Sequence, residues 1–195
     1  MKLIKLTNKN DQTFNNTQWG NNVTHSVKWS GKFCSSGCIH VYKDLLVALM
    51  LNPIHANFNP VHAWQANGVI LKNDNGLKFG VKKLTTIKRL DLLKISTSQR
   101  IAFGIFCASE IVGDTEWRYW ANNWIKGVDR SAAAAYAANA AANAAAAAAA
   151  NAAANAAYAA NAAAAAAANA AAYAAAYRTK SLDFAKLART AMTIK

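Results

Sequence analysis

The stretch WQANGVILKNDNGLKFGV, residues 64–81, decides the fold of the first part of the chain. Its centre, Asn73-Asp74-Asn75-Gly76, is typical of a tight hairpin turn because Asn and Gly accept positive φ angles at little cost. The apolar-rich runs on either side therefore predict two antiparallel strands, residues 64–71 and 77–81. Residues 83–90 predict a further strand.

Shorter signals before the hairpin predict the rest of a sheet. Residues 23–29 alternate apolar and polar side chains, which indicates a strand. Residues 33–42 indicate a turn that leads into a short strand. Asp44 predicts the start of a buried apolar helix, and Asn52-Pro53 predicts its end.

Two more helices are expected after the hairpin. Ser96 or Ser98 caps a helix that Gly113 ends. Residues 114–130 predict an aromatic connector helix with Trp117, Trp120 and Trp124 on one face. Residues 1–113 are thus expected to form an α+β head, a small, mostly antiparallel sheet with two or three helices.

The next segment is made almost entirely of alanine. Residues 132–176 hold 36 Ala, 6 Asn and 3 Tyr, and no charged side chain. Ala has the highest helix propensity, and neither Gly nor Pro interrupts the segment. Residues 131–177 therefore predict one long helix, a rod of roughly 70 Å.

The polar residues of this rod repeat with an 11-residue period, which places them on one stripe almost parallel to the helix axis. The stripe consists of Tyr136, Asn139, Asn143, Asn151, Asn155, Tyr158, Asn161, Asn169, Tyr173 and Tyr177. So much exposed methyl surface favours close packing against other copies, with the stripe setting the register. The alternatives are a solvated spacer and a surface-binding rod. The segment resembles the Ala-rich antifreeze helices of fish only superficially, because their regularly spaced Thr is missing.

Residues 178–195 predict a basic, amphipathic tail helix. Its apolar positions include Phe184, Leu187 and Met192. This face either folds back onto its own chain or docks onto a neighbouring copy, and the length of the rod favours the neighbour.

The net charge of +13 suggests a nucleic-acid partner. The densest basic run includes Lys82-Lys83 and Lys88-Arg89. Neighbouring residues of a strand face opposite sides, so the spacing favours the solvated side of a sheet edge. Nucleic-acid binding stays an alternative.

The cysteine count, the first residues and the polar residues of the rod all predict an intracellular protein without a membrane span. Three cysteines are an odd number, which predicts free thiols in an intracellular setting. The first residues predict no secretory signal peptide. The regular Asn residues of the rod disfavour a transmembrane span, so no membrane partner is expected.

The cysteines and histidines predict no catalytic site, metal site or cofactor. Cys34, Cys38 and His40 lie close in sequence, but structural zinc needs a second ligand pair, and no spacing predicts one. A Cys–His nucleophile would lack an orienting third group. Buried thiols and a hydrogen-bonded His are favoured.

The run from Cys34 to Tyr42, followed by an apolar helix ending at Asn52-Pro53, resembles a family of uncharacterised proteins of tailed phages. The resemblance covers residues 2–130, and the chain differs from the motif by Cys38 between Gly37 and Ile39. It implies a phage source, in the host cytoplasm or the virion, and no established activity.

A fainter likeness to ADP-ribosyltransferase-like folds implies a pocket for a nucleotide-like ligand, lined by His40, Tyr42 or Trp64. We therefore expect a non-enzymatic structural protein that assembles with itself into a bundle, filament or tube. One alternative is a multimeric module that sequesters a nucleotide-like host signal, and the other is a basic nucleic-acid-binding protein.

Overall fold

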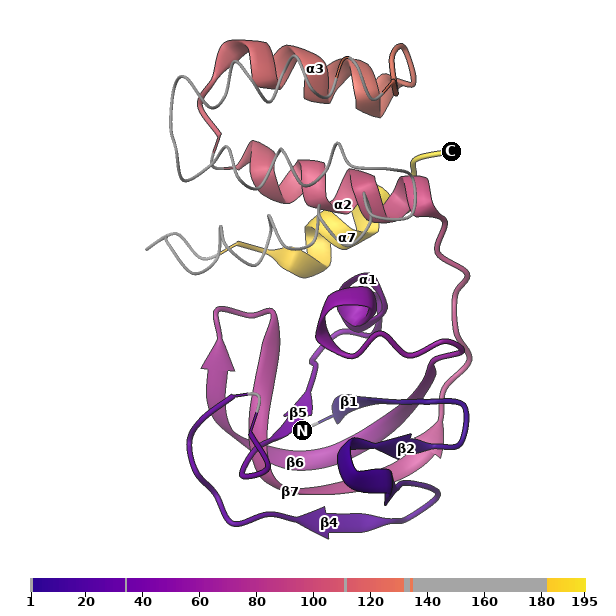
Figure 1. Ribbon diagram of the computed structural model, residues 1–195, viewed down its shortest axis with the longest axis vertical. Helices are drawn as coiled ribbons and strands as arrows, with labels where there is room; N and C mark the ends of the chain where they lie inside the picture. Colours follow the sequence, from indigo (N-terminus) through magenta and orange to yellow (C-terminus); the bar gives the residue numbers. More distant parts are fainter. Residues whose placement is uncertain (1, 34, 111, 132–133, 135–181) are drawn as a thin grey trace. The chain divides into compact units, whose positions relative to one another are not determined.

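The computed structural model describes residues 2–33, 35–110, 112–131, 134 and 182–195 (Figure 1). The chain divides into two compact units, Met1–Lys94 and Ile95–Lys195, here called the sheet unit and the helical unit. The predicted rod and its stripe of Asn and Tyr residues lie outside the described residues.

The sheet unit is built on a five-stranded antiparallel sheet in the order β1-β6-β7-β4, with β5 also paired to β7 (Figure 1). A backbone bridge between Ile4 and Tyr42 joins the end of β5 to β1. A separate two-stranded sheet, β2 with β3, encloses a short 3-10 helix. The strands and this helix are β1 (Lys2–Thr7), β2 (Gln12–Thr13), η1 (Phe14–Asn16), β3 (Thr17–Gln18), β4 (Thr24–Ser26), β5 (Ile39–Val41), β6 (His62–Asp74) and β7 (Lys78–Arg89).

The hairpin between β6 and β7 confirms the turn predicted from Asn73-Asp74-Asn75-Gly76. Asn75 and Gly76 have φ angles of 46° and 88°, and the side chain of Asn73 accepts a hydrogen bond from the Gly76 amide at 2.8 Å. The return strand differs from the prediction, because residues 78–89 form one strand and not two. Register shifts between β6 and β7 absorb the irregular spacing of apolar residues along it.

The lysine-rich strand was wrongly assigned to a sheet edge. β7 pairs with β6 on one side and with β4 and β5 on the other, so it lies inside the sheet. Sequence alternation does not reveal how many neighbours a strand has, and Lys82, Lys83 and Lys88 are exposed although the strand is central.

One face of the sheet forms a closed hydrophobic core. Its buried residues come from four strands and from the segment after β3: Leu3, Trp19, Ile39, Val41, Ala66, Phe79, Val81 and Leu84. Strand alternation turns every second side chain of β5, β6 and β7 toward this core and the others away from it.

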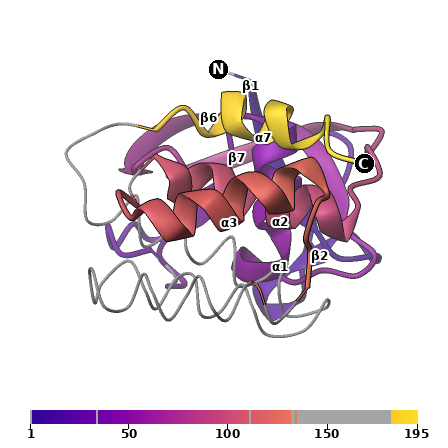
Figure 2. The same cartoon turned by 90° about the horizontal axis from the view of Figure 1, so that it is seen from above.

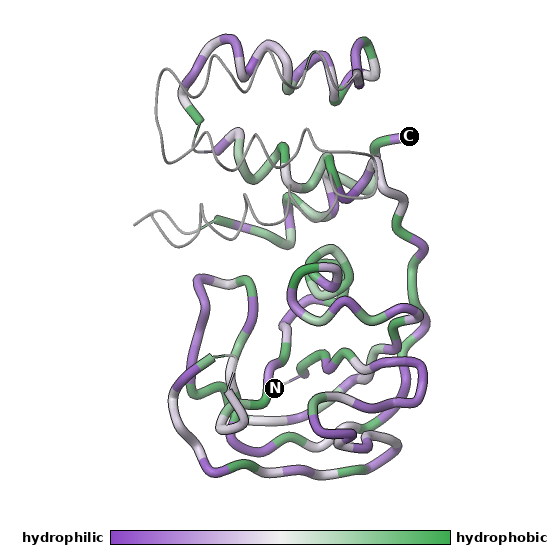
Figure 3. Tube along the Cα trace, viewed as in Figure 1, coloured by the Kyte–Doolittle hydropathy of each residue, from purple (hydrophilic) through white to green (hydrophobic). Residues whose placement is uncertain are grey.

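Helix α1 (Leu45–His55) begins at Asp44, as predicted, and the Asp44 carboxylate accepts hydrogen bonds from the amides of Leu46 and Val47. It is hydrophobic along most of its length (Figure 3). The helix does not end at Asn52, as the sequence suggested. Pro53 lies within its last turn, and the Asn52 carbonyl still accepts bonds from the amides of Ala56 and Asn57.

The helical unit contains α2 (Thr97–Ser109), α3 (Thr115–Lys126) and α7 (Phe184–Ala191), and α2 contacts both of the others (Figures 1 and 2). The predicted N-caps and the Gly127 stop are confirmed, but α2 ends at Ser109 and not at Gly113. Ser96 and Gln99 form a capping box on α2, Asp114 caps α3, and Gly127 ends α3 in the left-handed conformation. Helix α2, which was predicted to belong to the head of residues 1–113, lies in the helical unit, and the sheet unit ends at Lys94.

The tail helix lies on its own chain. Gln99 Nε2 donates to the Met192 carbonyl at 3.0 Å, and Arg130 Nη1 donates to the Lys195 carbonyl at 2.9 Å. Phe184 is buried, whereas Leu187 and Met192 are half-buried. In the described chain this face lies on α2, and docking onto a neighbouring copy stays a prediction.

Candidate ligand-binding site

His40 and Tyr42 lie on the same side of the sheet, away from the core. Their neighbours Ile39 and Val41 fill the core, so strand alternation turns His40 to the opposite face. The Tyr42 phenol lies 3.1 Å from Nδ1 of His55, and the two rings stack with centroids 6.0 Å apart. Helix α1 supplies His55 because it continues past Pro53.

An aromatic ring and two lysines complete this group. The Phe33 ring lies 5.6 Å from the His40 ring, between centroids. Lys72 of β6 and Lys78 of β7 place their ammonium groups 5.1 Å and 5.4 Å from the centre of Phe33. We call His40, Tyr42, His55, Phe33, Lys72 and Lys78 the His40 site.

Gly80 allows the segment around Cys38 to approach β7 closely. Gly80 stands opposite His40 in the register of β5 and β7. A Cβ atom at this position would lie 2.6 Å from Sγ of Cys38 and 3.2 Å from the Trp29 ring. A side chain at Gly80 would therefore displace Cys38 and Trp29.

Burial keeps both imidazoles of the site neutral near pH 7. Burial, together with the charges of Lys78 and Lys5, lowers the pKa of His40 to about 4. Burial, Lys78 and His40 lower the pKa of His55 to about 4. Each neutral ring carries one donor and one acceptor nitrogen, so the positive charge of the site resides on its lysines.

Lys5 is a buried residue of β1 that hydrogen-bonds to the backbone of His40. Its ammonium donates to the His40 carbonyl at 3.2 Å and lies 5.5 Å from the Trp19 ring centre. Burial lowers the pKa of Lys5 to about 8, against the opposing influence of Cys38. This amine therefore fixes the backbone of His40 between β1 and β5.

The structure does not place Trp64 with His40 and Tyr42. The Trp64 indole donates to Oδ1 of Asp11 at 3.0 Å, and the Arg89 guanidinium lies 5.3 Å from a ring centre of Trp64. Trp64 thus belongs to a different cluster, and the structure does not bring it together with His40 and Tyr42.

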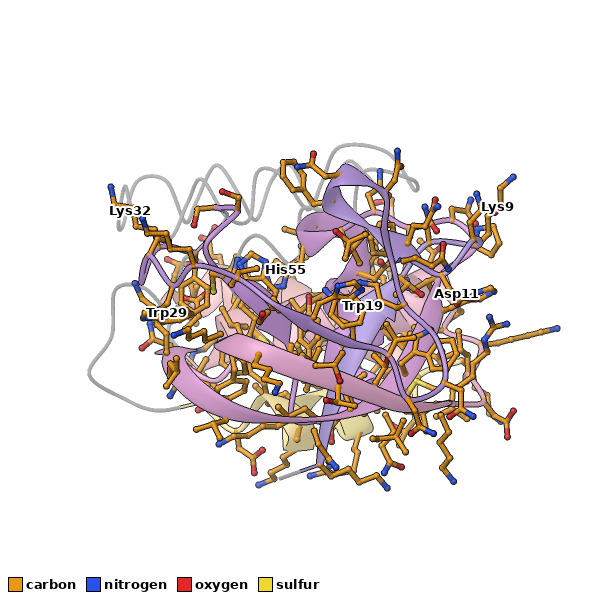
Figure 4. All side chains as sticks on the ribbon, turned by 90° about the horizontal axis from the view of Figure 1, so that it is seen from below. Lys9, Asp11, Trp19, Trp29, Lys32 and His55 are labelled. Carbon is orange, nitrogen blue, oxygen red and sulfur yellow. The ribbon has the colours of Figure 1, made fainter. Side chains whose placement is uncertain are left out.

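Asp11 is the centre of that cluster. His62 Nδ1 lies 2.9 Å from its carboxylate, Arg89 pairs with it, and Figure 4 shows Asp11 beside Trp19, whose amide donates to the Asp11 carbonyl. Burial opposes ionisation of Asp11, but the hydrogen bonds from His62 and Trp64 and the charge of Arg89 lower its pKa. With these donors satisfied, the carboxylate connects the β1–β2 turn to β6 and β7 and serves as a structural anchor.

Sequence reasoning missed His55, Phe33, Lys72 and Lys78. Phe33 stands next to the cysteine motif, and that position was a usable signal. His55 was not included because the sequence predicted the end of the helix at Asn52-Pro53, before this residue. The two lysines join the site only through the pairing of β6, β7 and β5, which the sequence does not specify.

Metal and thiol chemistry find no support in the described part of the chain. Among the residues that the structure describes, no three His, Cys, Asp or Glu side chains gather as metal ligands would. Cys38 and Cys107 are buried, and burial and Glu110 raise the pKa of Cys107. Cys34 lies outside the described residues.

No protein-family model, no curated protein and no solved structure matches this chain. None of the helices in the described ranges has the length and apolar character that a membrane span needs.

Proposed function

We propose that the sheet unit binds a small anionic ligand with an aromatic ring, such as a nucleotide, at the His40 site. The observation that carries this proposal is the meeting of two lysines, two neutral imidazoles and two aromatic rings on one side of β5. Lysine ammonium groups attract phosphate, and imidazole nitrogens can donate to phosphate oxygens or accept from the edge of a base.

The burial and the weak pairing of Lys78 favour phosphate binding. Lys78 is almost buried, with its side chain 11% exposed, so its charge is less screened by water than that of a surface lysine. Its pairing with Asp74 is loose, at 3.8 Å. An incoming phosphate would therefore compete with the Asp74 carboxylate for Lys78.

Calorimetric titration of the full chain with NAD-derived and cyclic nucleotides tests this proposal. Protein near 100 μM, on the order of a weak ligand's dissociation constant, gives measurable heat if the site binds. His40→Gln and Lys78→Gln should each weaken binding at least about tenfold, equivalent to about 1.4 kcal/mol. Lys28→Gln, an exposed lysine with the same charge change, is the matched control. Absence of heat with every nucleotide, or equal losses in all three variants, would refute the proposal.

A second function, self-assembly, is proposed on a separate observation, the 11-residue period of residues 131–177. A continuous Ala-rich helix would bury its methyl surface only against other helices, and the regular Asn and Tyr residues would set the register of a bundle, filament or tube. This proposal treats the protein as structural and non-enzymatic, with other copies of itself as partners.

Sedimentation velocity and electron microscopy of the full chain test assembly. Ala147→Leu and Ala165→Leu should prevent close helix approach and reduce the sedimentation coefficient of the assembly. A wild-type monomer at micromolar concentration contradicts this second function, and so does assembly that the two leucines leave unchanged.

A further inference from the structure

A row of polar side chains crosses four strands of the sheet unit on the face away from the core. Lys2 of β1 stands opposite Asn67 of β6, Asn67 stands opposite Thr85 of β7, and Thr85 stands opposite Thr24 of β4. Directly opposed residues of antiparallel strands share a face. The Thr24 and Thr85 hydroxyls confirm this, because they hydrogen-bond to each other at 2.7 Å.

Neighbouring pairs extend this row and bring two more lysines to it. Ser26 is opposite Lys83, and Gln65 is opposite Lys88. Lys2, Lys83 and Lys88 are all exposed. We call the row and these two pairs the lysine face.

The other side of the same strands is closed. Ala66, Leu84 and Thr86 alternate with the residues of the lysine face and have no exposed surface. All residues of the lysine face are exposed or half-buried, whereas Ile4, opposite Gln65 on the same side, is buried. The lysine face is thus the solvent-accessible part of this side of the sheet, and its side chains hold fixed relative spacings along the strands.

Few negative charges are available to neutralise this face. The sheet unit contains 13 Lys and Arg but only four acidic residues, all Asp. Asp11 pairs with Arg89 and His62, Asp44 caps α1, and Asp74 lies near Lys78. Within the part of the chain that the structure describes, no ion pair involves Lys2, Lys83 or Lys88.

We propose that the lysine face binds a nucleic-acid duplex through its phosphates, without sequence preference. Lysine, hydroxyl and amide side chains are the groups that contact phosphates in such complexes. The row spans three strand spacings, about 14 Å. That width is comparable to the major groove, about 12 Å wide, so Lys2 at one end of the row and the Thr24 hydroxyl at the other can contact opposite phosphate backbones.

The composition of the face favours a duplex over the other partners of a basic surface. Single-strand binding uses aromatic rings as stacking platforms, and none of the eight residues of the lysine face is aromatic. Interfaces with proteins are depleted in lysine at their centres, where aromatic side chains gather instead. Neither pattern fits this surface.

The test is fluorescence anisotropy of a short labelled duplex of mixed sequence, titrated with the full chain between about 50 and 200 mM salt. We expect the affinity to fall with rising salt. The triple variant Lys2→Gln/Lys83→Gln/Lys88→Gln should bind at least about tenfold more weakly at low salt. Its log–log salt slope should be smaller by about 2.7, since each lost phosphate contact removes about 0.9.

The matched control is Lys9→Gln/Lys32→Gln/Lys94→Gln, which removes three exposed lysines outside the lysine face. Circular dichroism of both triple variants verifies that the fold is retained. Equal losses in the two variants would show that net charge, not this face, drives binding, and would overturn the proposal. Absence of duplex binding at low salt, or tighter binding of the single strand, would overturn it as well. The face shares no residue with the His40 site, so failure of one proposal leaves the other to its own test.

Discussion

The phenol of Tyr42 and Nδ1 of His55 lie 3.1 Å apart and connect the end of β5 to the last turn of α1. The same pair stacks its rings, with an interplanar angle of 18°. The contact thereby fixes α1, the only α-helix of the described sheet unit, against the strand that carries His40.

Removing this hydroxyl should loosen the end of α1. Tyr42→Phe keeps the ring stacking and loses one hydrogen bond in a half-buried place, which should cost about 1 kcal/mol of unfolding free energy. Hydrogen–deuterium exchange should show faster exchange in the last turn of α1. Protection equal to that of the wild type would contradict a structural part for this bond.

Acid should destabilise the sheet unit through His40 and His55. Both groups have an ordinary pKa of 6.5 and a folded pKa of about 4, so the unfolded chain takes up protons first as the pH falls. Stability should therefore be fully present above pH 6.5 and should decline toward pH 4. Denaturant midpoints measured across this range check the decline. The double variant His40→Gln/His55→Gln should show a flatter profile, and an unchanged slope would contradict this assignment.

The Asp11 cluster should respond strongly to loss of its charge. Asp11→Asn weakens the hydrogen bonds to His62 and Trp64 and leaves Arg89 without its anion, which should cost about 2 kcal/mol. Asp91→Asn removes the same charge from an exposed residue and should change stability by less than about 0.5 kcal/mol. Urea unfolding of both variants makes the comparison, and equal effects would contradict the role of Asp11 as an anchor.

The close approach at Gly80 gives a further prediction. Gly80→Ala places a Cβ atom against Sγ of Cys38 and should destabilise the protein by about 1–3 kcal/mol. Gly113→Ala is the control, because a Cβ atom there meets nothing within 4 Å. Thermal unfolding followed by circular dichroism measures both. If Gly80→Ala also reduces nucleotide binding, the position of Phe33 depends on this contact.

The sequence was informative wherever a structural signal is local. The Asn75-Gly76 turn, the Asp44 and Asp114 caps and the Gly127 stop each depend on one or two residues and on the backbone angles that those residues allow. These signals yielded the antiparallel hairpin and the three helices of residues 45–126 without any knowledge of tertiary packing.

Features that depend on pairing between distant residues could not be predicted. His40 and Tyr42 share a face because of strand alternation, which is local and readable from the sequence. Trp64 was misplaced because its partner Asp11 lies 53 positions away in the chain. The lysines of β7 were misassigned for the same reason, since the strands that cover both edges of β7 come from earlier in the sequence.

The bridge between Ile4 and Tyr42 has a consequence for solubility. It gives β1 a second neighbour, so each of the three longest strands, β1, β6 and β7, is paired on both sides along part of its length. Unpaired strand edges recruit other chains and start aggregation, and ring closure hides most of that backbone. Cutting this bridge would turn a self-contained sheet into a template for intermolecular strand addition.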